Sequence, residues 1–235
     1  MKTDAAAANS PRPLSPRMRS ALIAGALVIL AITGLLIYAL ATGPRGLAPQ
    51  QEAGALPATR TDSSVLDDAG PDAPTLVEFV DFECEACGAF YPVVEQIREQ
   101  YAGRINYVIR YFPIASHANA MNAALAVEAA AQQGQVEDMY HRMFETQAEW
   151  GEQQTSQADL FRSFAEDLGL DLTAYDDAVA DPATQERVQQ DLDDGQALGV
   201  QGTPTFFLDG QRLELSSASD LTDALDRALD GSGGA

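Results

Sequence analysis

A motif with two cysteines constrains this chain more than any other feature. Cys84 and Cys87 are the only cysteines among 235 residues, and they stand as Cys-Glu-Ala-Cys. The motif follows an apolar run typical of a buried strand, residues 76–80, and opens a helical pattern. Much later in the chain, Thr203-Pro204 precedes another apolar, strand-like run. A C-x-x-C pair at a strand-to-helix junction, with a distant Thr-Pro before a strand, indicates thiol–disulfide chemistry.

The N-terminal region carries a candidate membrane anchor. Residues 21–41 are apolar and uncharged, and a helix of this length rises about 30 Å, enough to cross a bilayer. Basic residues precede the segment, so the positive-inside rule leaves residues 1–20 in the cytoplasm. We expect a single-pass signal-anchor in the cell membrane. A cleaved signal peptide is the alternative, because residues 39–41 (Ala-Leu-Ala) resemble a cleavage site. Both interpretations place the C-terminal part outside the cytoplasm.

The rest of the chain divides into a linker and one domain. Residues 42–74 are rich in Gly, Pro, Ala, Ser, Thr and Asp without a sustained period, which is typical of a flexible tether. Residues 75–230 are long enough for one domain with a sizeable core. Nothing in the pattern indicates an oligomer, so we expect a monomer.

The charge of the chain is strongly negative. It has 14 basic and 35 acidic residues, for a net charge of −21, and Lys2 is its only lysine. Such a surface argues against nucleic-acid binding. Two origins stay open: a salt-loving source, in which salt screens the repulsion, or a GC-rich genome that favours Arg and Ala.

Apolar periodicity predicts a mixed α/β architecture. Strands are expected at residues 76–82 and 104–112, with a helix between them that starts near residue 86 and contains Pro92. Further helices are expected at 116–133, 136–147, 157–168, 172–179 and 183–198, followed by a hairpin, 205–208 with 212–215, around Asp209-Gly210 and a last helix at 219–229. This order predicts a parallel strand pair and an antiparallel hairpin in one mixed sheet, with a helical insertion at about residues 115–198.

Cys84 is the expected nucleophile. At the first position of a helix, free N–H groups and the helix dipole lower a thiol pKa. Cys87 lies one turn on, where it can close a disulfide and resolve a mixed disulfide. An inert cross-link is a weak alternative, because a four-residue loop saves little chain entropy. The only histidines, His117 and His141, fit no common zinc spacing, so we expect no metal and no cofactor.

Three further residues complete the predicted site. Glu78 lies on the incoming strand, where alternation favours a core position behind the cysteines. A buried carboxyl has a raised pKa and can exchange a proton with Cys87; a solvated edge position is the alternative. Pro204 after Thr203 is compatible with a cis bond that turns the Thr203 backbone toward a bound peptide. An ordinary trans proline is the alternative there.

Other side chains near the motif have simpler interpretations. Glu83 and Glu85 place negative charge beside Cys84 unless water solvates them. His117 is expected to cap or pack at a helix start. Trp150 is expected in the core of the helical insertion, together with its neighbouring phenylalanines.

Several stretches together resemble a known family. They are Val-Glu-Phe-Val-Asp-Phe-Glu-Cys-Glu-Ala-Cys (77–87), Arg-Tyr-Phe-Pro-Ile (110–114), Ser-His-Ala-Asn-Ala (116–120), Met-Phe-Glu-Thr-Gln-Ala-Glu-Trp (143–150) and Leu-Gly-Val-Gln-Gly-Thr-Pro-Thr-Phe-Phe-Leu-Asp-Gly (198–210). Through them the chain resembles DsbA-like thiol–disulfide oxidoreductases of the thioredoxin-like superfamily, in the membrane-anchored or secreted branch that includes BdbD-type proteins.

The resemblance implies a thioredoxin-like fold with an inserted helical domain. It implies Cys84 as the attacking nucleophile, Cys87 as the resolving thiol, Glu78 as the buried acid and Pro204 as the cis-proline. It also implies unfolded or reduced exported proteins as substrates. A quinone-linked membrane partner of the DsbB or VKOR type is the implied re-oxidant.

The residues between the cysteines depart from the strong oxidants of this family. Those often carry Pro-His there, and the histidine stabilises the thiolate, whereas this chain has Glu85-Ala86. A carboxylate at this position is expected to raise the Cys84 pKa and destabilise the reduced form. The hypothesis is a milder oxidant.

Three functions are compatible with the sequence. The first is an extracytoplasmic oxidoreductase that introduces disulfides into exported proteins. The second is a reductase or isomerase that a membrane electron donor keeps reduced. The third is a redox-inert, acidic binding or chaperone module held at the membrane.

Overall fold

The computed structural model describes residues 57–232, all within one compact unit. The expected anchor at residues 21–41 and the tail at 1–20 lie outside the described residues. Between residues 57 and 232, no helix has both the length and the apolar character that a membrane span requires.

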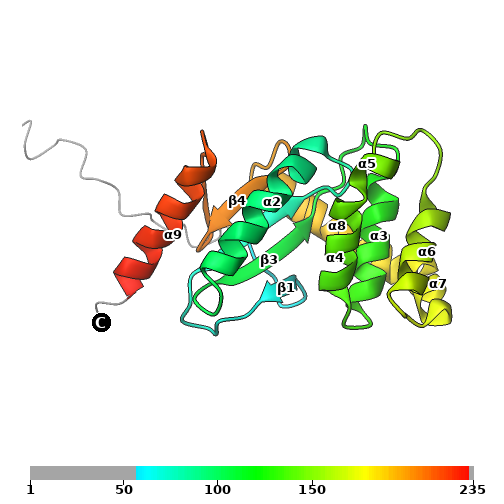
Figure 1. The fold of residues 1–235 in the computed structure, drawn as a ribbon, viewed down its shortest axis with the longest axis horizontal. Helices are drawn as coiled ribbons and strands as arrows, with labels where there is room; N and C mark the ends of the chain where they lie inside the picture. The colour runs from blue at the N-terminus through cyan, green and yellow to red at the C-terminus, as the bar shows by residue number, and fades with distance from the viewer. Residues whose placement is uncertain (1–56, 233–235) are drawn as a thin grey trace, which may run out of the picture. The chain divides into compact units, whose positions relative to one another are not determined.

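A five-stranded mixed sheet forms the centre of the fold (Figure 1). Its order is β1-β3-β2-β4-β5, with β2 parallel to β3 and the other neighbours antiparallel. The strands are β1 (Ser64–Asp67), β2 (Thr75–Val80), β3 (Asn106–Tyr111), β4 (Thr205–Leu208) and β5 (Gln211–Arg212). The predicted parallel pair and the antiparallel hairpin are confirmed.

Helices follow the order that the periodicity predicts. They are α2 (Glu85–Gln100), α3 (Ala120–Ala131), α4 (Val136–Glu145), α5 (Gln147–Trp150), α6 (Ala158–Asp167), α7 (Leu172–Ala180), α8 (Pro182–Ala197) and α9 (Ala218–Ser232). Helix α5 is short and separate, beginning where a single longer helix was expected to end. In Figure 1, α3, α4, α6 and α7 gather beside one end of the sheet, while α2 crosses it. The thioredoxin-like α/β fold is confirmed.

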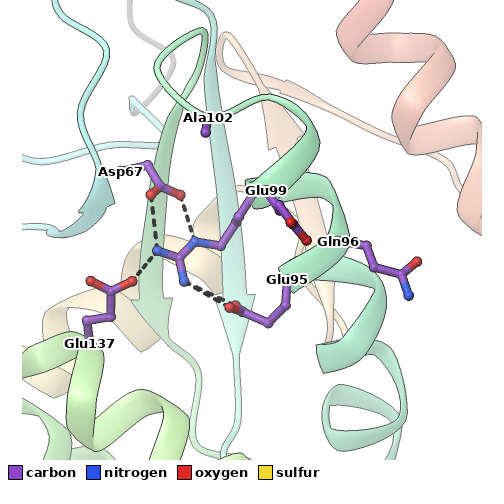
Figure 2. A pocket seen from close by; sticks show the side chains of 7 residues that line it. Asp67, Glu95, Gln96, Glu99, Ala102 and Glu137 are labelled. Carbon is purple, nitrogen blue, oxygen red and sulfur yellow. Dashed lines mark hydrogen bonds and ion pairs between the residues drawn. The ribbon is translucent and has the colours of Figure 1, made fainter.

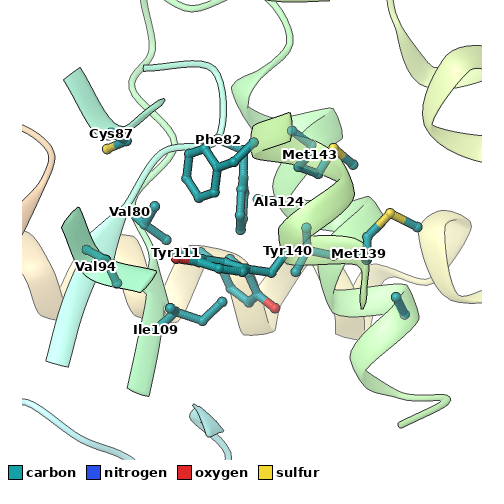
Figure 3. Close-up of a cluster of buried hydrophobic side chains, with 14 of the residues drawn as sticks. Val80, Phe82, Cys87, Val94, Ile109, Tyr111, Ala124, Met139, Tyr140 and Met143 are labelled. Atoms are coloured by element: carbon teal, nitrogen blue, oxygen red, sulfur yellow. The ribbon is translucent and has the colours of Figure 1, made fainter. Parts of the chain in front are cut away.

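Alternation along β2 sends side chains to two different cores. Leu76 and Val80 belong to the larger cluster, which includes Val94 of α2 and Leu221 of α9. That cluster continues into the helical segment, where Figure 3 shows Phe82, Tyr111 and Tyr140 between the strands and the helices. Burying one face of β2 under α2 fixes which residues lie behind the first turn of that helix.

The second face of the sheet is covered by α8. Val77 and Phe79 pack there in a smaller cluster against Leu192. Arg110 of β3 donates to Asp191 of α8 at 2.7 Å, and both side chains are fully buried. The last helix of the expected insertion is therefore part of the covering of the sheet.

Strand β1 corrects the expected linker at residues 42–74. Three of its four residues pair antiparallel with the edge of β3, with an irregular register at Leu66, and Ala58 upstream is buried. Two apolar residues, one of them the exposed Val65, give no alternation long enough to predict a strand. The strand forms because the edge of β3 offers unpaired N–H and C=O groups.

The hairpin turn has the backbone that its residues favour. Asp209 and Gly210 have φ values of 49° and 78°, as a type I′ turn requires. Strand β5 is shorter than expected, although Leu213 still donates to the Phe206 carbonyl at 2.8 Å.

Candidate thiol–disulfide site

Cys84 and Cys87 lie at the start of α2, both as free thiols. Cys84 is the N-cap residue, with φ −67° and ψ 121°, and its side chain is 8 % exposed. Cys87 is 1 % exposed and faces the core. The outer sulfur is therefore the one that another molecule can reach first.

The pKa of the Cys84 thiol is lowered to about 5. The largest cause is a hydrogen bond from the Cys87 thiol; burial opposes it, and Thr203 and the N–H groups of Cys87 and Ala86 add to the lowering. The sulfur makes no capping hydrogen bond of ordinary geometry, yet these N–H groups still favour its charge. Glu85 is exposed and is not among the principal causes, so the increase expected from its carboxylate does not prevail.

The pKa of the Cys87 thiol shifts in the opposite direction. Burial raises its pKa well above the ordinary value, and the Cys84 sulfur and the charge of Glu78 raise it further. At neutral pH the site therefore holds an outer thiolate and an inner thiol. This asymmetry is what a nucleophile and a resolving thiol require.

Glu78 is buried in β2, on the face toward α2, so the solvated alternative is wrong. It is 2 % exposed, and burial raises its pKa to about 7. The Tyr107 hydroxyl donates to Glu78 Oε2 and partly offsets that increase. Tyr107 was not among the predicted site residues, because its role depends on the pairing of β2 with β3.

The Thr203–Pro204 peptide bond is cis, so the trans alternative is wrong. The Cys84 Sγ lies 3.5 Å from the Thr203 carbonyl oxygen, to which it can donate when it is protonated. The Thr203 hydroxyl is buried and lacks a hydrogen bond of ordinary geometry within the described residues, yet it lowers the pKa of both cysteines. The structure therefore brings the two predicted halves of the site together.

Gln147 was missed by the sequence interpretation. From α5 its amide donates to the carbonyls of Phe82 and Cys84, at 2.7 and 2.9 Å. A Cβ on Gly88 would lie 1.9 Å from Gln147 Oε1, so only glycine fits beside this amide in its present position. The helical segment thus contacts residues 81–84, the redox turn, directly. A glutamine at the end of a predicted helix carries no sequence signal for this contact.

Two buried acids flank the turn before Cys84. Asp81 is 1 % exposed; its Oδ1 accepts from the Glu83 N–H and its Oδ2 from the Ile114 N–H, both at 2.9 Å. Glu83 is also buried, so its solvated interpretation is wrong, and its Oε2 accepts from the Asn119 N–H at 2.6 Å. The loop between β3 and α3 is therefore docked on the redox turn.

The structure also places Trp150 and His117, the two remaining side chains considered near the site. Trp150 is fully buried and stacks edge-on against Phe161, with ring centroids 4.8 Å apart, as expected for the core. His117 lies in the loop before α3, bonded to Asp81 and not capping the helix. Within residues 57–232, no cluster of His, Cys, Asp and Glu is arranged to hold a metal ion.

A family model described as thioredoxin matches residues 70–227. Among solved structures, alpha-DsbA1 of Wolbachia pipientis is 20 % identical, with a TM-score of 0.64 over 74 % of this chain and 94 % of that one. BdbD of Bacillus subtilis, in its oxidised form, is 18 % identical, with a TM-score of 0.63 over 72 % and 94 %. A thioredoxin-like oxidoreductase from Silicibacter pomeroyi is 25 % identical, with a TM-score of 0.61 over 73 % and 94 %.

Curated relatives resemble this chain over a shorter stretch. A Na(+)/H(+) antiporter, NhaA 3 of Salinispora tropica, is 40 % identical over 146 residues, and NhaA 1 of Mycolicibacterium gilvum is 36 % identical over 148. The matches cover 61 % and 60 % of this chain but only 21 % and 23 % of those proteins. The chain therefore spans about a fifth of the length of these relatives.

Proposed function

This chain belongs to the thioredoxin family, and from that premise we propose that it introduces disulfides into exported proteins through Cys84 and Cys87. The observation that carries the proposal is the opposed ionisation of the two thiols. Cys84 has a pKa of about 5, whereas the pKa of Cys87 lies well above its ordinary range.

The proposed cycle moves two electrons from a substrate dithiol to the Cys84–Cys87 disulfide. A substrate thiolate attacks the Cys84 sulfur, the bond between the two cysteines breaks, and Cys87 leaves. A second substrate thiolate then attacks the substrate sulfur of the mixed disulfide, and Cys84 leaves as a thiolate. A thiol of low pKa is a fast leaving group, so release of the oxidised substrate is favoured.

Glu78 is proposed as the proton donor and acceptor for Cys87. As Cys87 leaves it gains a proton, since its pKa is well above its ordinary range. A buried carboxyl with a pKa of about 7 can supply that proton and take it back during re-oxidation. Thr203 and Pro204 are proposed as the substrate-binding pair, with a peptide joining the Thr203 backbone like an added strand.

The low Cys84 pKa also favours the oxidase over the reductase alternative. Stabilising the thiolate stabilises the reduced form of the pair, which makes its disulfide a stronger oxidant. The proposed setting is a single-pass cell-membrane protein whose domain faces outside the cytoplasm. Its proposed partners are unfolded or reduced exported proteins and a quinone-linked re-oxidant of the DsbB or VKOR type. The antiporter activity named for its relatives is not part of the proposal.

Oxidative refolding of a reduced protein tests this function. The oxidised full-length chain, at catalytic amounts in a glutathione buffer, is expected to accelerate disulfide formation, and Cys84→Ser is expected to abolish the acceleration. Cys87→Ala cannot form the Cys84–Cys87 disulfide that the substrate attacks, so it is also expected to lose the acceleration. A wild-type chain no faster than Cys84→Ser would contradict the proposal.

A further inference from the structure

His117 lies on the loop that docks against the redox turn. Its Nδ1 is 2.7 Å from Asp81 Oδ2, and the Asp81 carbonyl accepts the Cys84 N–H at 3.1 Å. The same loop supplies the N–H groups of Ile114 and Asn119 to the two buried acids. One residue, Asp81, thus connects the imidazole to the turn that presents Cys84.

Two buried acids place negative charge beside the turn that carries Cys84, in addition to the donors that lower its pKa. Asp81 and Glu83 are both buried beside Cys84, and negative charge on either disfavours a thiolate. In residues 57–232, no arginine hydrogen-bonds to residues 81–84; the imidazole of His117 does. Because it is only 29 % exposed, its charge is partly shielded from water.

The ionisation of His117 agrees with this arrangement. Burial lowers its pKa, but the hydrogen bond and charge of Asp81 outweigh burial, and Cys84 and Glu83 add to the increase. The net result is a raised pKa, so the imidazolium is more populated near neutral pH than in an ordinary histidine. The N–H groups of Glu83 and Ile114 donate to Asp81 and fix the orientation of its carboxylate. In that orientation Oδ2 faces the imidazole of His117.

We propose that His117, held by Asp81, is the cationic partner that stabilises the Cys84 thiolate from outside the C-x-x-C motif. Asp81 is the positioning residue that holds the imidazole through the Nδ1–Oδ2 contact. The inference rests on the proposed exchange at Cys84, but it concerns an equilibrium property that needs no turnover.

A proton NMR titration of the full-length wild-type protein is the first test. The chain has two histidines, so His141 is a built-in control. A thiolate is present only in the reduced protein, and linkage is reciprocal. The His117 pKa is therefore expected to be higher in the reduced than in the oxidised form by about one unit, or about tenfold in proton affinity. The ring signals of His141 should show no difference between the two forms. Equal His117 pKa values in the two forms would overturn the proposal without any mutation.

Variants provide the second test, read by thiolate absorbance at pH 3–9. His117→Gln is expected to raise the Cys84 pKa by about one unit and to lower the reduction potential by about 30 mV, the value for a tenfold change. His117→Lys keeps a positive charge and is expected to preserve most of the low pKa, as is the control His141→Gln. A Cys84 pKa unchanged in His117→Gln would overturn the assignment. If refolding catalysis failed while the coupling persisted, only the proposed function would be wrong.

Discussion

At the scale of single residues, the site separates three ionisable groups that the sequence places close together. Cys84, Cys87 and Glu78 lie within ten positions of one another, yet burial and hydrogen bonding move their pKa values in different ways. N–H groups and the Cys87 thiol donate to Cys84 and lower its pKa. Burial removes Cys87 and Glu78 from water and raises both of their pKa values. A buried carboxyl that is retained at a cost in stability is typical of a group with a functional role.

Glu78 is expected to make the stability of the reduced protein depend on pH. Its folded pKa of about 7 lies above the ordinary 4.5, so the folded state is penalised increasingly from pH 4.5 to 7 and fully above that range. Glu78→Gln is therefore expected to raise the free energy of unfolding at pH 8.5 by about 3 kcal/mol, and by little at pH 4.5.

Urea unfolding at the two pH values measures this difference. Glu186→Gln, at an exposed position, serves as the control and should show no such pH dependence. An equal effect of Glu78→Gln at pH 4.5 and 8.5 would show that the carboxyl has no raised pKa.

Glu85 offers a second test at the residue scale. It is exposed at the first position of α2, one residue after the thiolate. Glu85→His replaces a negative group by one that can be positive, so it is expected to lower the Cys84 pKa and raise the reduction potential by about 30 mV or less. Glu85→Gln, which only removes charge, should give a smaller shift. A potential that stays unchanged in Glu85→His would contradict the hypothesis of a milder oxidant.

At the scale of elements, periodicity predicted most of the fold and little of how the loops meet. Strands β2 and β3 and helix α2 bury faces that recur along the sequence, so their positions could be predicted. Glu78 followed from the same alternation. Strand β1 could not be predicted, because a short edge strand depends on its neighbour for order.

Contacts between loops and the redox turn explain the other omissions. Gln147 and His117 reach this turn only after α3, α4 and α5 have packed beside the sheet. The sequence around Gln147 does not indicate that it binds a backbone carbonyl, and the sequence around His117 does not indicate that it binds Asp81. The residues proposed for exchange could therefore be named from the sequence, whereas the contacts of Gln147 and His117 required the tertiary structure.

The contact between α2 and α5 predicts that Gly88→Ala changes stability in opposite directions with and without the Gln147 side chain. Gly88→Ala displaces the Gln147 side chain, so it is expected to lose two hydrogen bonds and about 1–2 kcal/mol of stability. In a Gln147→Ala background that conflict is gone, and Gly88→Ala is expected to stabilise α2 by about 1 kcal/mol. A double-mutant cycle by urea unfolding measures both. The same sign in both backgrounds would contradict the proposed clamp.

A second contact between elements involves Arg98 on α2. Figure 2 shows Asp67 of β1, Glu95 of α2 and Glu137 of α4 converging on one place, and Arg98 is hydrogen-bonded to all three. The Arg98 side chain is nearly buried. Its positive charge pairs with all three carboxylates, which would otherwise repel one another. The cluster therefore joins the edge strand and the helical segment to α2.

At the scale of the whole molecule, negative charge is the dominant feature. With a net charge of −21, repulsion destabilises the folded state at low salt, and salt screens that repulsion. The melting temperature is expected to rise by about 2–4 °C between 0.05 and 0.5 M NaCl, the change that about 1 kcal/mol produces in a domain of this size.

The melting temperature is also measured with sucrose in place of NaCl at equal osmolarity. This control separates the screening of charge repulsion by salt from the exclusion of a solute from the protein surface. Sucrose strengthens burial without screening charge, so it should give a smaller change at the same osmolarity. A melting temperature that falls as NaCl increases would contradict the account of the acidic surface and the interpretation as a salt-adapted protein.

The reduction potential of the Cys84–Cys87 pair tests the central claim most directly. The full-length chain is equilibrated with glutathione buffers, and the reduced fraction is measured by thiol alkylation. A disulfide donor with a stabilised Cys84 thiolate is predicted to have a potential less negative than about −200 mV. A value near −270 mV, at the thioredoxin end of the range, would contradict the proposal and identify the pair as a reductant.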